Sequence, residues 1–350
     1  MADQEQKRGE EFLKTEDGFR GNALKIIMKM DDLSNKAPGS KHLVDEILHS
    51  IFFLGKINKP PFSPEDIFPD GDILEALMAK YPRPFQFYLT QLPRRSPFSC
   101  VLDMIVLQNN LEGKAQITNS LKDLIEELKL KKHKRGKLFL VSSTICISQK
   151  SKTDQNSKRY YGVSMSTNDR NPRKIVIAAS CLSKWDEYVS GAVMTYYPNN
   201  EKKKCFDGTI EVPENIRCEA FKLCNGEKMN PCRSCHNLFG LNTEETKEWP
   251  YGNCAEAESL SNLLQNEQDV KNEIITSPQD RQKSENEVRT VLTELLETNN
   301  FRGWNGEFYI PGSEFDVIKS ELTDIKSELA DIKSELADIK SGLADIKSSA

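Results

Sequence analysis

The sequence has no long hydrophobic run. Its apolar stretches, such as residues 51–54 and 138–141, are only a few residues long, whereas a helix needs about 20 apolar residues to span a bilayer. The opening residues, MADQEQKRGEEF, are polar and charged and lack the apolar core of a secretory signal. The sequence therefore predicts neither a membrane span nor export.

The chain also lacks a strong charge of either sign. It carries 48 Lys and Arg against 53 Asp and Glu, a net charge of −5 over 350 residues, and this excludes a generic nucleic-acid binder with a large basic excess. Nine cysteines, an odd number, without an export signal suit a reducing compartment, where thiols stay free or bind metal. We expect a cytoplasmic or nuclear protein.

The residues that carry chemistry are concentrated in residues 231–264, PCRSCHNLFGLNTEETKEWPYGNCAEAESLSNLL. Cys232 and Cys235 have a Cys-x-x-Cys spacing that lets two thiolates on one helical turn reach a single tetrahedral zinc ion. Cys254 follows after 18 intervening residues and opens a run with helical spacing. Three protein ligands leave the fourth zinc position for a water that can ionise near neutral pH. Glu256 is then placed to move protons without binding the metal.

These two motifs resemble those of the cytidine deaminase superfamily. In its nucleoside-acting members, a Cys-Ala-Glu and a Pro-Cys-x-x-Cys at two helix starts hold zinc, and the glutamate is the general acid and base. The matching segments are 254–256 and 231–235, about a tenth of the chain with their flanks. The resemblance implies a zinc-dependent hydrolytic deaminase that acts on a cytidine-type nucleoside, nucleotide or nucleic-acid base.

The chain departs from that family in three respects. The order of the two motifs is reversed, Ala257 stands where relatives carry an arginine, and no counterpart of the sugar-binding Asn and Glu is found. A plain circular permutation is excluded because 18 residues cannot hold the intervening strands. A local exchange of the two helices is feasible, since a helix of about 10 residues is roughly 15 Å long and a loop of about 10 residues spans up to roughly 33 Å.

Other readings of these cysteines stay open. A structural zinc knuckle would add Cys224, Cys218 or His236 to the three cysteines, and Cys232 to His236 also fits the attachment pattern of c-type haem. A redox pair or buried free thiols would need no metal. The alternative function is thus a catalytically inactive, zinc-stabilised oligomeric interaction protein.

The sequence predicts three regions before the C-terminal repeat, and the cysteine motifs lie in the third. We expect a disordered tail over 1–20, a mainly helical domain over 21–136, and a deaminase-like α/β domain over 137–312 with a mixed sheet and zinc-bearing helices. Helices are expected at 23–30, 42–54, 73–81, 100–111 and 119–131, and strands at 138–148, 159–166, 174–179 and 192–197. The basic run 129–137 ends the last of these helices and has no interleaved aromatic residue for stacking on bases.

A seven-residue repeat fills residues 318–348, within a predicted C-terminal coiled coil over 313–350. Leucines such as Leu322 and Leu329 take position a, and isoleucines such as Ile318 and Ile325 take position d. Leucine at a with isoleucine at d favours more than two strands. We therefore predict self-association as a parallel trimer or tetramer.

Overall fold

The computed structural model describes residues 2–312 except 38, 110–113, 134–135, 155, 168 and 277–279, and the side chains from residue 18 on. Met1–Tyr309 form one compact unit and Ile310–Ala350 a second. The predicted coiled coil lies outside the described residues. The division into a tail, two domains and a coil stays a prediction.

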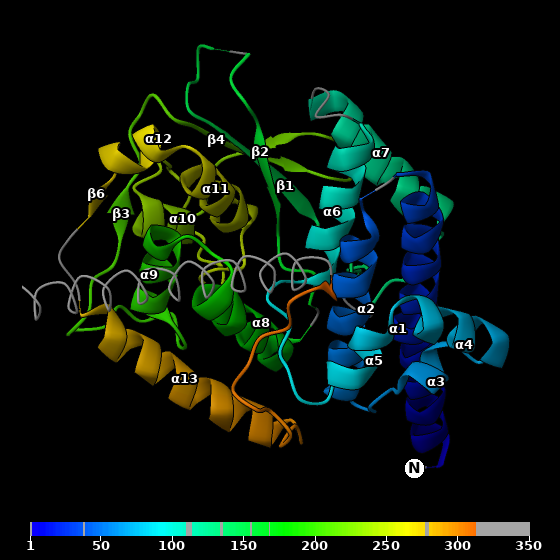
Figure 1. Ribbon diagram of the computed structural model, residues 1–350. Helices are drawn as coiled ribbons and strands as arrows, with labels where there is room; N and C mark the ends of the chain where they lie inside the picture. Colours follow the sequence, from blue (N-terminus) through cyan, green and yellow to red (C-terminus); the bar gives the residue numbers. More distant parts are fainter. Residues whose placement is uncertain are drawn as a thin grey trace, which may run out of the picture. The chain divides into compact units, whose positions relative to one another are not determined.

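Helices make up the first part of the compact unit (Figure 1). They are α1 (Ala2–Lys36), α2 (Lys41–Lys56), α3 (Pro64–Ile67), α4 (Gly71–Lys80), α5 (Pro82–Phe87), α6 (Pro97–Gln108) and α7 (Lys114–Glu127). A helix thus occupies the segment for which composition favoured a disordered tail. Helix α2 is buried from Leu43 to Gly55 and packs against α1, α5 and α6. The mainly helical character expected for this region is confirmed.

The sheet is antiparallel throughout. Strands β1 (Thr144–Gln149), β2 (Tyr160–Val163), β4 (Arg217–Lys222) and β5 (Lys228–Met229) lie in the order β2-β1-β4-β5. Strands β3 (Ile210–Glu211) and β6 (Ile275–Thr276) form a separate antiparallel pair. The α/β class is confirmed. The prediction of a mixed sheet is wrong for the described strands, because β1 runs antiparallel to both β2 and β4, and β4 runs antiparallel to β5.

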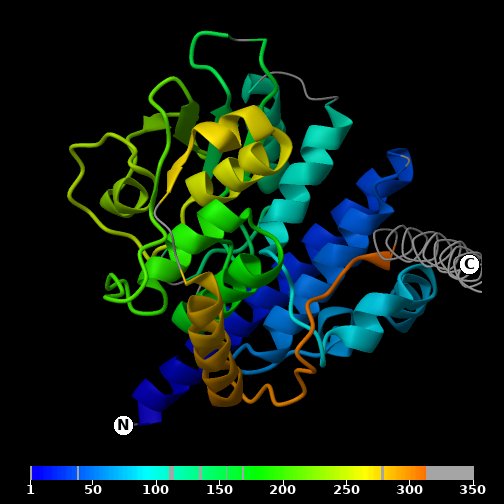
Figure 2. The same cartoon turned by 60° about the vertical axis from the view of Figure 1, so that its left-hand side comes forward.

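Two segments expected to be strands are helical. Residues 174–179 lie in α8 (Arg170–Ser183), and residues 192–197 overlap α9 (Glu187–Tyr196). A short apolar run has the same appearance in a buried strand and a buried helix, and residues 175–181 are all buried. Helix α8 packs against α9 and against α13 (Arg281–Thr298), an arrangement visible in Figures 1 and 2.

The two cysteine motifs begin α10 (Arg233–Phe239) and α11 (Ala255–Asn266), and α12 (Gln268–Glu273) follows. Helix α11 lies against β1, β2 and β4. Gly162 of β2 makes this approach possible, since a Cβ atom there would lie 2.6 Å from the carbonyl oxygen of Ala255 and closer still to the amide of Ser259. The hydroxyls of Ser259 and Ser148 are 2.9 Å apart and join the helix to β1.

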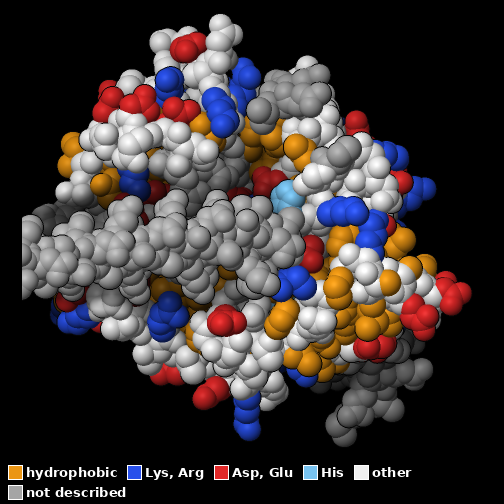
Figure 3. Space-filling model, in the orientation of Figure 1, with side chains coloured by type: hydrophobic (Ala, Val, Ile, Leu, Met, Phe, Trp, Pro, Cys, Tyr) orange, Lys and Arg blue, Asp and Glu red, His pale blue; other side chains and the backbone are white. Residues whose placement is uncertain are grey.

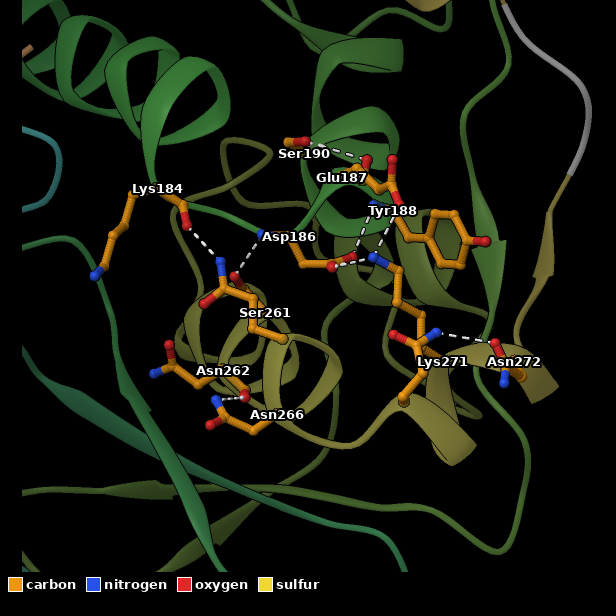
Figure 4. A network of polar contacts seen from close by, with 12 residues as sticks. Lys184, Asp186, Glu187, Tyr188, Ser190, Ser261, Asn262, Asn266, Lys271 and Asn272 are labelled. Atoms are coloured by element: carbon orange, nitrogen blue, oxygen red, sulfur yellow. Dashed lines mark hydrogen bonds and ion pairs between the residues drawn. The ribbon is translucent and has the colours of Figure 1, made fainter. Parts of the chain in front are cut away.

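The far end of α11 is fixed by a polar network (Figure 4). The amide of Asp186 donates to Ser261 Oγ at 2.8 Å, and Gln265 Nε2 donates to the carbonyl of Lys184 at 2.7 Å. From α12, Lys271 Nζ lies 2.7 Å from the Asp186 carboxylate. Helices α11 and α12 are therefore tied to the connection between α8 and α9.

Acidic and basic side chains are interspersed on the face drawn in Figure 3, in keeping with the small net charge of −5. Within the described part of the chain, no helix combines the length and the apolar character that crossing a membrane requires.

Candidate metal centre

Three sulfur atoms from the two motifs converge at the starts of α10 and α11. Cys232 and Cys254 are the residues that precede these helices, both in extended conformation, and Cys235 lies one turn into α10. The Cys232 sulfur is 3.6 Å from that of Cys235 and 3.6 Å from that of Cys254, and all three lie within 4.8 Å of one another. Zinc–sulfur bonds of roughly 2.3 Å in a tetrahedron place sulfur atoms about 3.8 Å apart. The geometry therefore fits a metal ion such as zinc.

The chain segment between the motifs runs back beside α10. Gly240, with φ of 66°, ends that helix in the left-handed conformation. The returning loop is held by the amide of Arg233, which donates to the carbonyl of Lys247 at 3.0 Å, and by Ser234 Oγ, which donates to the carbonyl of Trp249 at 2.6 Å. This path allows both helices to start at the cluster despite the reversed order of the motifs.

A tight turn places Cys254 at the head of α11. Gly252 has φ of 81°, and a Cβ atom there would lie 2.9 Å from side-chain carbons of Ile177 and Val193. Only glycine accepts both the backbone angle and the close packing. The amide of Asn253 then donates to the carbonyl of Pro250 at 3.0 Å. This turn leads directly into Cys254.

The three thiols differ in their affinity for protons. Hydrogen bonds with Cys235 and Cys254 lower the pKa of Cys232 to about 2. The same contacts with Cys232 raise the pKa of Cys235 and of Cys254 well above the ordinary value of a thiol. A helix N-terminus also favours negative charge on its first residue. At neutral pH the metal-free cluster is thus one thiolate with two thiols.

Glu256 lies beside the cluster in the first turn of α11. Its side chain is buried, 5% exposed, and burial raises its pKa to about 7, with the charge of Cys232 adding to the increase. A carboxyl group with a pKa near the working pH can both take up and release a proton. Cys232, Cys235 and Cys254 form the potential metal group without Glu256.

The residues that would complete a four-ligand knuckle do not join the group. Cys224 is exposed, the Cys218 sulfur is 3.7 Å from that of Cys146, and His236 Nδ1 lies 3.0 Å from the carbonyl of Leu241. In the portion of the chain described, the three cysteines are the only group of three or more such side chains close enough to hold one ion. The fourth position of a tetrahedral ion would therefore be filled from outside the group.

The surroundings of Ala255 were not predicted from the sequence. The methyl group of Ala255 packs in a small apolar cluster with Cys146 and Ala220, and Cys218 and Met229 lie at its edge. No sequence signal connects these residues, because only the pairing of β1 with β4 brings them together. They form the surface on which the start of α11 rests.

Comparisons with known proteins found no match among family models, curated proteins or solved structures. Fold and site define a mixed α/β protein with a three-cysteine group suited to a metal ion. The resemblance to the cytidine deaminase superfamily is carried by the two motifs alone.

Proposed function

We propose that this protein is a zinc-dependent hydrolytic deaminase of a cytidine-type nucleoside, nucleotide or nucleic-acid base. The observation that carries the proposal is the convergence of Cys232, Cys235 and Cys254 beside the buried carboxyl group of Glu256. Three sulfur ligands with an open fourth position are typical of catalytic rather than structural zinc. A general acid and base next to that position completes what hydrolytic deamination needs.

In this proposal Glu256 carries the protons. A zinc ion held by the three cysteines would lower the pKa of a water molecule at its open position. Glu256 would accept a proton from the attacking water as a carbon–oxygen bond forms at the amino-bearing ring carbon. It would then give a proton to the amino group, so that the carbon–nitrogen bond breaks and ammonia leaves.

The absence of an arginine after Glu256 bears on this role. Three thiolates and one divalent cation leave a net negative site, and Ala257 is apolar and buried at 1% exposure. Negative charge nearby favours the protonated carboxyl group. We therefore expect this ligand set to raise the pKa of Glu256, because no adjacent arginine in the motif offsets its negative charge.

The test is ammonia release by zinc-loaded protein from cytidine, deoxycytidine, their monophosphates and a short single-stranded oligodeoxycytidine. Glu256→Gln should lower the rate by about 10²–10⁴-fold while one zinc per chain is retained by mass spectrometry. Glu244→Gln, an exposed change in the loop between the motifs, is the matched control and should keep full activity.

A structural role makes the opposite set of predictions. If no substrate releases ammonia while Cys254→Ser removes zinc and unfolds the protein, the enzyme proposal is wrong. The cysteines would then stabilise the fold of a catalytically inactive interaction protein, whose binding would be strengthened by oligomerisation.

A further inference from the structure

A small pocket at the start of α8 is lined by three cationic side chains. Arg170, Arg173 and Lys174 contribute the charge, and the pocket has a volume of about 60 Å³. Since one water needs about 15 Å³ measured in this way, the pocket has room for about four waters or for the five heavy atoms of a phosphate group. The other lining residues are Ile177, Tyr196, Tyr197, Pro198, Asn199, Asn200, Pro250 and Tyr251.

The charged side chains among the described residues that line this pocket are all basic, and none is a carboxylate. Burial lowers the pKa of Lys174, and the charge of Arg170 lowers it further. Outside that lining, Asp169 directly precedes Arg170 at the N-cap of α8, and Glu248 Oε1 lies 3.4 Å from the hydroxyl of Tyr251. An anion in the pocket would relieve the repulsion between these cations.

Neutral groups opposite α8 complete the wall. Asn200 Oδ1 accepts a hydrogen bond from the backbone amide of Tyr251 at 3.4 Å. The Nδ2 group of Asn200 therefore points away from that backbone amide. The rings of Tyr196 and Tyr251 stack with centroids 4.0 Å apart and planes at 8°. The lining of the pocket therefore combines cations from one helix with two asparagine side chains and a stacked pair of tyrosines.

Tyr251 links the pocket to the elements that carry the metal centre. Tyr251 precedes Cys254 by three residues, so their Cα atoms are at most about 11 Å apart. The hydroxyl of Tyr251 also accepts from Asn237 of α10 at 2.7 Å, two residues after Cys235. One side chain thus forms part of the pocket wall and contacts the helix that carries two of the three sulfur atoms.

We propose that this pocket binds the phosphate group of a phosphorylated ligand. Arginine and lysine together with amide donors are the groups that proteins use to hold phosphate. The identification of that ligand as the substrate rests on the proposed deaminase function, and it narrows the substrate from a free nucleoside to a nucleotide or a nucleic-acid strand. The phosphate would be held next to the metal centre that acts on the base.

Binding is tested on the full zinc-loaded chain with inorganic phosphate as the probe, by isothermal titration at low ionic strength. Loss of charge-assisted hydrogen bonds should weaken phosphate binding at least about tenfold in Arg170→Gln/Lys174→Gln. Arg302→Gln, which changes an exposed arginine elsewhere, is the matched control and should bind as the unmodified chain does. Equal affinity in the double variant and the unmodified protein would overturn the proposal.

The source of the phosphate is resolved in the Glu256→Gln background, where turnover is blocked. Cytidine 5′-monophosphate should bind at least about tenfold more tightly than cytidine, and the double variant should abolish the difference. A single-stranded oligodeoxycytidine that binds more tightly still, with a steep salt dependence, identifies a nucleic-acid strand. No advantage of the oligomer over the monophosphate identifies a nucleotide.

Failure of this proposal is distinct from failure of the proposed function. Ammonia release from cytidine without any phosphate binding would remove the pocket proposal and leave the enzyme. Phosphate binding that depends on Arg170 and Lys174, without ammonia release from any substrate, would remove the enzyme and leave the phosphate site.

Discussion

The sulfur atom of Cys232 lies 3.6 Å from that of Cys254, although the two residues are 22 positions apart in the chain. Both residues precede helices, so both sulfur atoms lie where the backbone favours negative charge. This relationship makes the cluster a good site for a cation. It also fixes how many protons a metal ion must displace.

Zinc binding should release about two protons per chain at pH 7. Cys232, with its pKa near 2, is already a thiolate, whereas the raised pKa values of Cys235 and Cys254 keep both protonated. The apparent zinc affinity should therefore rise by about 100-fold per pH unit near neutrality. Isothermal titration in two buffers with different protonation enthalpies measures the number of protons released on zinc binding. The control Cys205→Ser, which changes an exposed cysteine outside the cluster, should release the same number of protons. Release of about three protons from the unmodified chain would contradict the thiolate at Cys232.

Gly162→Ala should destabilise the protein by about 2 kcal/mol or more and weaken zinc binding. The added methyl group would meet backbone atoms of α11 at Ala255 and Ser259, and backbone yields less readily than a side chain. Urea unfolding provides the free energy. In Gly21→Ala, where the new Cβ meets nothing within 4 Å, helix propensity should instead stabilise the protein by about 0.5–1 kcal/mol. Equal effects of the two changes would argue against the close contact between β2 and α11.

His49 should contribute a loss of stability between pH 7 and pH 5. The ring is buried and stacks on Tyr309 with centroids 3.8 Å apart, and burial lowers the pKa of His49 from 6.5 to about 3. Between these values the unfolded chain binds the proton and the folded chain does not, so this stabilisation is complete above pH 6.5 and decreases as the pH falls. At pH 5 the loss is about 2 kcal/mol, from about 1.4 kcal/mol per pH unit.

His49→Phe keeps a ring at this position and removes the titration. The change in unfolding free energy between pH 7 and pH 5, measured with urea, should differ by about 2 kcal/mol between this variant and the unmodified chain. Glu256, whose pKa is raised to about 7, and Cys232, whose pKa is lowered to about 2, also titrate on unfolding, but they act equally in the two proteins. The Glu46 carboxyl group, whose pKa is lowered to about 2 beside Arg95 against the effect of its burial, loses its stabilisation only below about pH 4.5 and so does not interfere at pH 5. Equal changes in the two proteins would contradict a buried neutral His49.

Residues 318–348 should hold three or four chains together. Leu329→Asp/Leu336→Asp puts charge at two a positions of the heptad repeat, where it would be buried between helices, and should yield monomers. Light scattering measures the mass. Ser327→Asp/Ser334→Asp places the same charge at outer positions of the repeat and should keep the oligomer. Retention of the native mass by the leucine variant would exclude the coiled-coil assembly.

Elements with a clear period were predictable from the sequence. Leu43, Ile47 and Ile51 recur at helical spacing, and α2 covers them, because one apolar face is enough to define an amphipathic helix. Residues 174–179 failed as a strand because an apolar run that is buried on all sides shows no period. The antiparallel direction of the strands could not be predicted from the sequence either, since it depends on which strands become neighbours.

The sequence by itself determined the pairing of Cys232 with Cys235, because one helical turn sets their separation, and it marked Cys254 and Glu256 as candidates by residue type. Tertiary structure alone decided that the third sulfur joins the other two, because this depends on the return of the loop beside α10 and on the close packing at Gly162 and Gly252. It also decided the raised pKa of Glu256 and the cation-lined pocket beside Tyr251. Both arise from burial and from contacts between distant segments, which local spacing does not encode.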